Sequence, residues 1–103
     1  MAISDVRIKN GFYQVFDNNG KKISEKSAPV MGDLLGIGLD FMVFSKSGFI
    51  NTYDETFKRI EQKSAPVLGD FKSVTGTSIN FIKSGFINTY DKHFKRLSQR
   101  PNR

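Results

Sequence analysis

The stretch SKSGFINTYDETFKRI at residues 45–60 decides the fold, because it occurs almost unchanged a second time. The second copy is IKSGFINTYDKHFKRL at residues 82–97, and 12 of the 16 positions are identical. The copies are 37 residues apart, and a diverged third copy, KNGFYQVFDNNGKKI, stands one period earlier at residues 9–23. A repeat of this length indicates a fold built from equivalent units that pack against one another.

The segments between these copies repeat as well. KSAPVMGDL at residues 26–34 matches KSAPVLGDF at residues 63–71 in seven of nine positions. The sequence therefore predicts one domain, residues 1–103, with nearly three units at about 1–33, 34–70 and 71–103. The first unit lacks the opening segment of the other two.

Each complete unit is predicted to contain four strands. Residues 42–44 lead into a short Lys-Ser-Gly turn, and residues 49–53 continue as the second arm of a hairpin. Asp54 opens another turn before a third strand. The Ser-Ala-Pro segment cannot lie inside a central strand, so it is the connector to the next opening strand, at residues 34–39 and 71–75. No window has helical spacing without these breakers, and we expect an all-β fold of antiparallel repeats.

The strand at residues 49–53 carries apolar side chains on both faces. Phe49 and Tyr53 point to one side, whereas Ile50 and Thr52 point to the other. This pattern suits a sheet stacked between two similar sheets better than an open sandwich with one wet face.

The unit resembles a short β-propeller blade, and it is also similar to the tandem WG-type repeats. The chain has no Trp, and Phe holds the anchoring positions. The residues that carry the resemblance are Gly48, Ile50, Tyr53 and Asp54, then Gly85, Ile87, Tyr90 and Asp91, and more weakly Gly11, Phe16 and Asp17.

The resemblance implies four-stranded blades arranged in a ring. Propellers need about four to eight blades, so we expect the chain to close a ring as a homo-oligomer, with a dimer of nearly six blades favoured. The alternative is a compact monomer whose three units pack around a pseudo-threefold axis, as in a trefoil.

The composition narrows the possible chemistry. The 103 residues include no Cys, which excludes disulfides, a thiolate nucleophile and Cys-ligated metals. No nucleophile, acid–base pair or phosphate-binding loop stands out, so we expect no enzymatic activity and no cofactor. The only histidine, His93, lies in a turn and forms no recognisable metal set. The first residues do not resemble a secretory leader, and we expect a cytoplasmic protein without a membrane partner.

The positive charge gathers near the C-terminus. The net charge is +6, and residues from Lys83 onward carry six basic groups and one acidic group, a net +5. Such a pole attracts an acidic protein surface or a nucleic acid. The candidate partner-binding residues are Lys58, Arg59, Tyr90, Lys92, Lys95, Arg96, Arg100 and Arg103.

Other side chains recur once per unit. The aspartates that begin reversals are predicted to cap turns rather than to bind a cation; they are Asp17, Asp54 and Asp91. The phenylalanines after the hairpin glycine are predicted to be core; they are Phe12, Phe49 and Phe86. Tyr53 and Tyr90 are left open between core and stacking roles.

These observations favour a non-enzymatic binding module that engages a macromolecule. A protein partner, in an inhibitor or immunity-like role, is the first hypothesis, and it rests on fold analogy. The alternatives are nucleic-acid binding through the basic C-terminal face and glycan binding between repeats.

Overall fold

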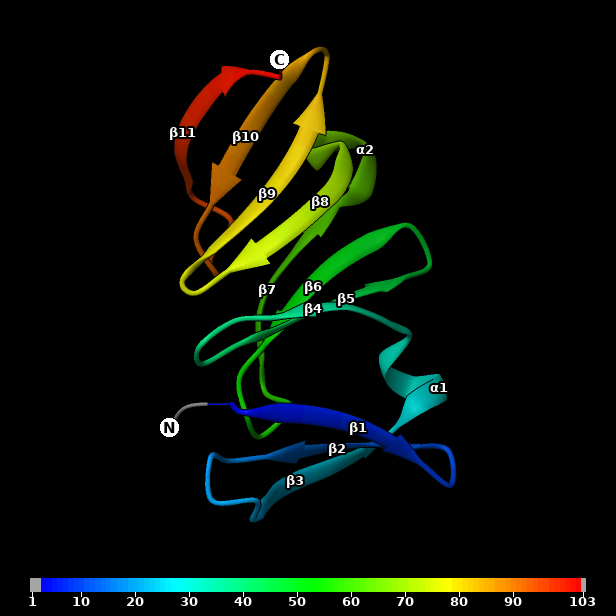
Figure 1. The fold of residues 1–103 in the computed structure, drawn as a ribbon. Coiled ribbons are helices and arrows are strands. Elements are labelled where there is room, and N and C mark those ends of the chain that lie inside the picture. Colours follow the sequence, from blue (N-terminus) through cyan, green and yellow to red (C-terminus); the bar gives the residue numbers. More distant parts are fainter. Residues whose placement is uncertain (1–2, 103) are drawn as a thin grey trace.

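The computed structural model describes residues 3–102 and contains three antiparallel sheets in that range, which confirms the all-β repeat prediction (Figure 1). Sheet 1 contains β1 (Asp5–Lys9), β2 (Phe12–Phe16) and β3 (Lys22–Ser27). Sheet 2 contains β4 (Asp33–Ile37), β5 (Met42–Lys46), β6 (Phe49–Tyr53) and β7 (Arg59–Ser64). Sheet 3 contains β8 (Asp70–Thr75), β9 (Ser78–Lys83), β10 (Phe86–Tyr90) and β11 (Arg96–Pro101).

The hairpin turns have the geometry that their sequence predicts. Lys46 pairs with Phe49 across the β5–β6 hairpin, and the two residues between them, Ser47 and Gly48, both have positive φ, 52° and 82°. Two successive positive φ values are characteristic of the tight turn that matches the twist of antiparallel strands. The corresponding turns of sheets 1 and 3 have the same conformation.

The turns that begin at Asp17, Asp54 and Asp91 are capped by the aspartate side chain, as predicted. The Asp54 carboxylate accepts hydrogen bonds from the backbone N–H groups of Thr56, at 2.9 Å, and Lys58, at 3.0 Å. The other two carboxylates accept the equivalent pair of bonds. These turns therefore use their carboxylates for the backbone.

One position in these turns distinguishes the sheets. Phe57 and Phe94 are buried although their φ values, 64° and 58°, lie in the left-handed region. That region is strained for a large side chain. Gly20 holds the equivalent position in sheet 1, at φ 77°. Phenylalanine therefore occurs in this strained conformation only in the two sheets where its ring packs against a neighbouring sheet.

The connectors between sheets contain one turn of helix each, which the sequence analysis did not predict. They are α1 (Ala28–Met31) and α2 (Ala65–Leu68), and each has a proline near its start. Proline suits this position because its fixed φ is helical and it lacks the N–H group that would stay unpaired there. Met31 and Leu68 at the helix ends are buried between the sheets.

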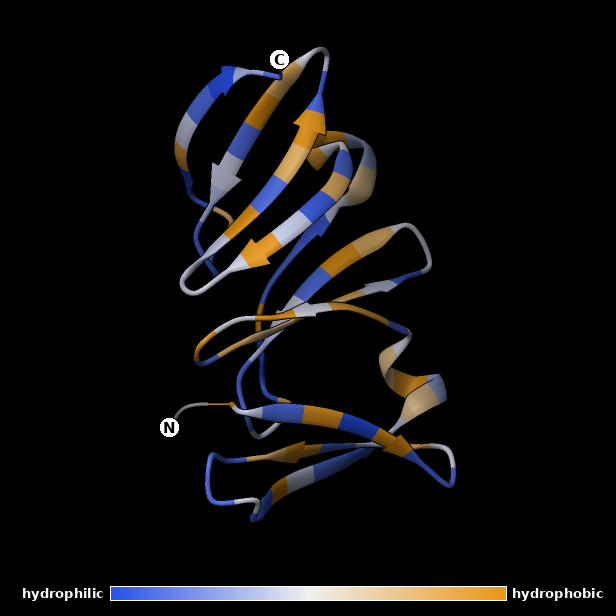
Figure 2. Ribbon diagram, viewed as in Figure 1, coloured by the Kyte–Doolittle hydropathy of each residue, from blue (hydrophilic) through white to orange (hydrophobic). Residues whose placement is uncertain are grey.

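The sheets stack face to face, and both faces of sheet 2 are covered, as predicted. Along β5, Met42 and Phe44 enter the core shared with sheet 1, whereas Val43 enters the core shared with sheet 3. Figure 2 shows the corresponding alternation of hydrophobic and hydrophilic residues along β1.

The three sheets form a row rather than a pseudo-threefold cluster. Within residues 3–102, one core joins sheets 1 and 2, a second joins sheets 2 and 3, and sheets 1 and 3 share none. The Cα trace extends 40 × 28 × 21 Å. A trefoil-like packing would place the three units around one axis, and the structure does not have this packing. Ring closure with a second chain stays a prediction.

Each outer face of the row carries a polar residue at a position that is apolar in the contacts between sheets. On sheet 1, Arg7 stands where sheets 2 and 3 carry Phe44 and Phe81; its guanidinium lies 4.6 Å from the Phe16 ring centroid. On sheet 3, Asn80 stands where sheet 2 carries Val43, and it hydrogen-bonds with Ser73 and Thr89. Polar outer faces are what the terminal units of stacked-repeat proteins require.

The left-handed phenylalanines give the first testable prediction. Phe94→Gly should relieve the backbone strain but remove a buried ring, and should lower the free energy of unfolding by about 2 to 4 kcal/mol. Gly20→Ala is the matched control, because nothing lies within 4 Å of its added Cβ; it should cost only about 1 kcal/mol of strain. Urea unfolding measures both, and a neutral Phe94→Gly would contradict the packing assigned to this ring.

The aspartate caps give a pH prediction. Burial raises the pKa of Asp54, but hydrogen bonds from Thr56 and Lys58 outweigh it and hold the pKa below its ordinary 3.8. The carboxylate therefore stabilises the fold above that value, and the contribution is lost as the pH falls through the lowered pKa. Asp54→Ala should cost about 1 to 2 kcal/mol at pH 7.

In acid, the difference between the wild type and Asp54→Ala should shrink as the pH drops below about 4. Asp70→Ala is the control, since the Asp70 carboxylate accepts no hydrogen bond from residues 3–102. Urea titrations at several pH values test this, and a constant difference from pH 7 to pH 2 would show that the carboxylate charge is irrelevant.

Candidate binding surface

The stack has two different long sides. One side carries the turns that begin at Asp17, Asp54 and Asp91, and we call it the turn side. The other carries the β1–β2, β5–β6 and β9–β10 hairpin turns together with α1 and α2, and we call it the hairpin side. Figure 1 shows these hairpin turns and both helices following one another along the stack.

Most of the predicted basic residues lie on the turn side and are exposed. Lys58 precedes β7 and Arg59 begins it, and Lys95 and Arg96 occupy the equivalent places before and in β11. Arg100 lies four residues further along β11, about 13 Å away at the rise of an extended strand, and therefore nearer the hairpin side. Arg103 lies outside the described residues. The structure does not bring the predicted set into one cluster.

Lys92 joins two sheets. Its ammonium lies 2.9 Å from a carboxylate oxygen of Asp40, and its backbone carbonyl accepts a hydrogen bond from Thr52 Oγ1 at 2.7 Å. The Lys92 ammonium is thus already engaged within the chain. A hollow of about 240 Å³ lies beside this ion pair and is lined in part by His93, whose backbone N–H donates to the Asp91 carboxylate.

Tyr90 belongs to the core rather than to a stacking platform. Its ring makes edge contacts with Phe81, at 5.9 Å between centroids, and with Phe94, at 6.4 Å. Tyr53 packs in the same way against Phe44. The tyrosine rings left open by the sequence are therefore packing residues.

The prediction that Phe12, Phe49 and Phe86 form the core is wrong. Their side chains are 41%, 44% and 41% exposed. Each is the first residue after a tight turn, paired with the end of the last strand of its sheet. Phe49 and Phe86 point toward the preceding sheet, which covers only part of each ring. Phe12 points to the outer face of sheet 1, because its neighbour Tyr13 faces the core shared with sheet 2.

Two valines add to this apolar surface. Val30 in α1 and Val67 in α2 are 53% and 51% exposed. Because the helices connect successive sheets on the hairpin side, these valines lie between successive hairpin turns. Nothing in the sequence pattern marked them, since a valine in a connector has no strand or helix period to reveal its face.

Two lysines are held across the same surface. Lys46 Nζ donates to the carbonyl of Val30 at 2.8 Å, and Lys83 Nζ donates to the carbonyl of Val67 at 3.0 Å. Neither ammonium has a carboxylate within ion-pair distance among residues 3–102. Each is therefore a positioned charge with donor capacity left over.

Glycine makes this arrangement possible. Gly32 and Gly69 follow the helices with φ of 88° and 98°, and a Cβ on Gly69 would lie 2.5 Å from the carbonyl oxygen of Ile82 and 2.8 Å from Lys83 Cβ. The helix end therefore packs directly on the backbone of the strand that carries the lysine. The same contact between Gly32 and Lys46 repeats one period earlier.

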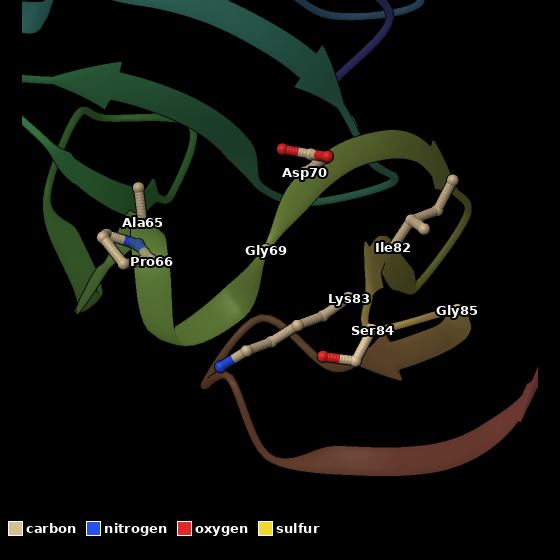
Figure 3. Close-up of a pocket in the computed structure, with 8 residues that line it drawn as sticks. All are labelled: Ala65, Pro66, Gly69, Asp70, Ile82, Lys83, Ser84 and Gly85. Carbon is tan, nitrogen blue, oxygen red and sulfur yellow. The ribbon is translucent and has the colours of Figure 1, made fainter.

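A hollow of about 640 Å³ lies at this contact in sheet 3 (Figure 3). Figure 3 shows Lys83 running from β9 toward α2, while the Asp70 side chain points away from Lys83. The hollow is lined by Ala65, Pro66, Gly69, Asp70, Ile82, Lys83, Ser84 and Gly85.

We define the hairpin ridge as these repeated, exposed groups of the hairpin side. It consists of Phe12, Val30, Lys46, Phe49, Val67, Lys83 and Phe86. Exposed basic residues, namely Lys9, Lys26, Lys63 and Arg100, lie at the same ends of the strands and outnumber the exposed acids there, Asp33 and Asp70. The ridge is apolar along its length and basic around it.

The described residues contain neither a group of three potential metal ligands nor a helix long and apolar enough to cross a membrane. Comparison with known proteins adds no family: no protein-family description and no curated protein matches the chain.

The glycine contact can be tested on stability. Gly69→Ala should lower the free energy of unfolding by about 2 to 3 kcal/mol, because the added methyl meets backbone at 2.5 Å and φ is positive. Gly85→Ala is the control with a similar φ of 80° and open space around its Cβ; it should cost about 1 kcal/mol. Equal losses in urea unfolding would show that helix and strand do not press together at Gly69.

Proposed function

We propose that the protein is a non-enzymatic binding module that engages an acidic protein partner through the hairpin ridge. The observation that carries this proposal is the recurrence of exposed phenylalanine and valine on one side of the stack. Exposed apolar groups that gather on one surface and are surrounded by polar residues characterise interaction sites. Aromatic residues in particular are enriched in protein–protein interfaces.

Charge supports an acidic partner. Lys46 and Lys83 lie within the ridge without carboxylate partners among residues 3–102, and further basic residues surround them. Complementary charge on the partner would speed encounter and fix its orientation. The basic turn side, with Lys58, Arg59, Lys95 and Arg96, would add long-range attraction without the apolar surface that a specific contact needs.

We also propose that the repeated units are related to propeller blades. The four-stranded meanders and their face-to-face stacking support it. The polar residues Arg7 and Asn80 on the outer faces favour a row that does not close into a ring, since they occupy places where the inner faces carry Phe44 and Val43. A solution mass of 11.7 kDa by light scattering would support the unclosed row, whereas about 23 kDa, twice the chain mass, would support the predicted dimeric ring.

Affinity capture with a ridge variant tests the function. The ridge variant replaces Phe12, Phe49 and Phe86 together by Ser. The control variant replaces Leu39 and Leu97 by Ser; these leucines are 57% and 56% exposed and lie outside the ridge. A stoichiometric protein from extracts of the source cell should be retained by the wild type and the control. The ridge variant should retain at most about a tenth as much, since clustered aromatic anchors dominate interface energies.

Two results would contradict the proposal. One is the absence of any stoichiometric protein in capture by the wild type. The other is a partner that the ridge variant retains in full while circular dichroism shows that this variant is folded. A single-stranded RNA oligonucleotide is titrated in parallel, and RNA binding that depends on Lys95, Arg96 and Arg100 and falls with salt would favour the nucleic-acid alternative instead.

A further inference from the structure

The outer edge of β1 differs from the edges of the other two sheets. In sheets 2 and 3 the strand equivalent to β1 pairs with an opening strand, β4 or β8, whereas sheet 1 contains only β1, β2 and β3 within residues 3–102 (Figure 1). The edges formed by β3, β7 and β11, in contrast, are equivalent in all three sheets. In the described chain, β1 therefore has a free edge at a place where both other sheets carry a strand.

The main-chain groups of Val6 and Ile8 point to this free edge. Lys9 lies next to the two-residue turn and is hydrogen-bonded to β2, and in an antiparallel pair such residues alternate with residues whose groups point away. The two equivalents of Ile8 have the same orientation. The carbonyl oxygens of Ser45 and Ile82 face the opening strand, where each would lie 2.5 Å from a Cβ added to the glycine before that strand. Sheet 1 thus presents donors and acceptors that no strand of residues 3–102 uses.

An apolar surface of sheet 2 lies beside the same edge. Leu34 and Ile37 of β4 face sheet 1 and are half-buried. One period later, the equivalent residues Phe71 and Val74 of β8 are packed by β4, where a Cβ added to Gly36 would lie 2.8 Å from Val74. Among residues 3–102, sheet 1 has no opening strand that could cover Leu34 and Ile37 in this way.

The outer face of β1 favours a negative charge on an added strand. Arg7 stands where sheets 2 and 3 carry Phe44 and Phe81, and each of these phenylalanines lies opposite a residue of the opening strand. An added strand would likewise place a residue opposite Arg7, and opposite charges on facing residues stabilise a sheet. Asp5 accepts a bond only from Nε of Arg7, at 2.8 Å, which leaves the two terminal amino groups for a second carboxylate.

We propose that the edge of β1 binds an extended segment of a partner protein, which adds a fourth antiparallel strand to sheet 1. The segment carries apolar or small residues on the side that faces Leu34 and Ile37, and a carboxylate opposite Arg7. Main-chain hydrogen bonds to Val6 and Ile8 hold it, the mode by which peptides extend an exposed sheet edge. The inference goes beyond the proposed function and does not depend on it, because the edge of β1 is not part of the hairpin ridge.

The first experiment uses the full chain and a nine-residue probe peptide. The probe has the sequence of residues 32–40 with Leu34→Glu, which places a carboxylate opposite Arg7. In β4 the same position packs against the core shared with sheet 1, so a glutamate there prevents the probe from replacing β4. In an NMR titration of the chain with this probe, the backbone amide signals of Val6 and Ile8 should shift most.

Two N-methylated probes form a matched pair. In β4, Gly36 pairs with Val43, the equivalent of Val6, whereas the N–H of Ile37 points away from the neighbouring strand. A methyl on the amide equivalent to that of Gly36 should weaken binding at least about fivefold, because it removes a main-chain hydrogen bond. A methyl on the amide equivalent to that of Ile37 should change binding no more than about twofold.

Variants of the chain give a second matched pair. Ile8→Pro removes an N–H at the edge without removing a bond to β2, and proline is tolerated at such edge positions. Ile8→Thr keeps the N–H, and its loss of apolar surface is small because Ile8 is 64% exposed. Probe affinity should fall at least about fivefold with proline and at most about twofold with threonine. Circular dichroism checks that both variants are folded.

Three outcomes would overturn the inference. The first is no shift of the Val6 and Ile8 signals at about 1 mM probe, a concentration at which weak binding is detected. The second is an equal loss of affinity with both N-methylated probes. The third is a species of twice the 11.7 kDa chain mass that Ile8→Pro converts to the single chain, which would assign the edge to a second copy.

Capture of the cellular partner separates this inference from the proposed function. If the probe fails to bind while the ridge variant loses the cellular partner, the proposed function stands and only the edge site is wrong. If the probe binds as expected while the ridge variant retains its partner in full, the edge site stands and the ridge is wrong.

Discussion

The structure depends on one packing contact, which occurs between sheets 1 and 2 and again between sheets 2 and 3. Phe44 lies at the centre of the first contact and meets the rings of Tyr13, Tyr53 and Phe57. Phe81 holds the same place in the second, among Phe71, Tyr90 and Phe94. Edge contacts of this kind add to the free energy gained by burying the rings. Because each contact involves only neighbouring sheets, the chain forms a row without one central core.

The ends of the row are adapted to water by substitutions at the same positions. In sheet 1, which no sheet precedes, the central phenylalanine is replaced by Arg7 and the left-handed phenylalanine by Gly20. At the other end Asn80 forms hydrogen bonds within its sheet. Within the row, Asn51 and Asn88 are buried, and the side-chain oxygen of each lacks a hydrogen-bond partner among the described residues. Apolar packing therefore stabilises the interior despite this cost.

The sequence predicted the architecture well because the repeat fixes the strands and turns together. Asp54 and the Ser47–Gly48 turn are local signals, so their conformations followed from neighbouring residues alone. The surface was predicted poorly for the opposite reason. Whether Phe49 or Tyr53 is buried depends on how far the next sheet overlaps the strand, and strand alternation places both on the same face. The predicted basic residues do not form one cluster, since Arg96 and Arg100 lie toward opposite ends of β11, and their role in binding stays a prediction.

The contact between the end of each helix and the lysine-bearing strand of the next hairpin has a consequence for how this surface can change in evolution. The glycine after each helix, the lysine and the valine carbonyl that it binds recur with the 37-residue period. The geometry of this contact is therefore contained within one repeat and its neighbour. Duplication of one period would insert a sheet whose two faces already match those beside it. The insertion would lengthen the ridge by one unit. The length of the ridge is therefore inherited in whole repeats, independently of the substitutions within each repeat.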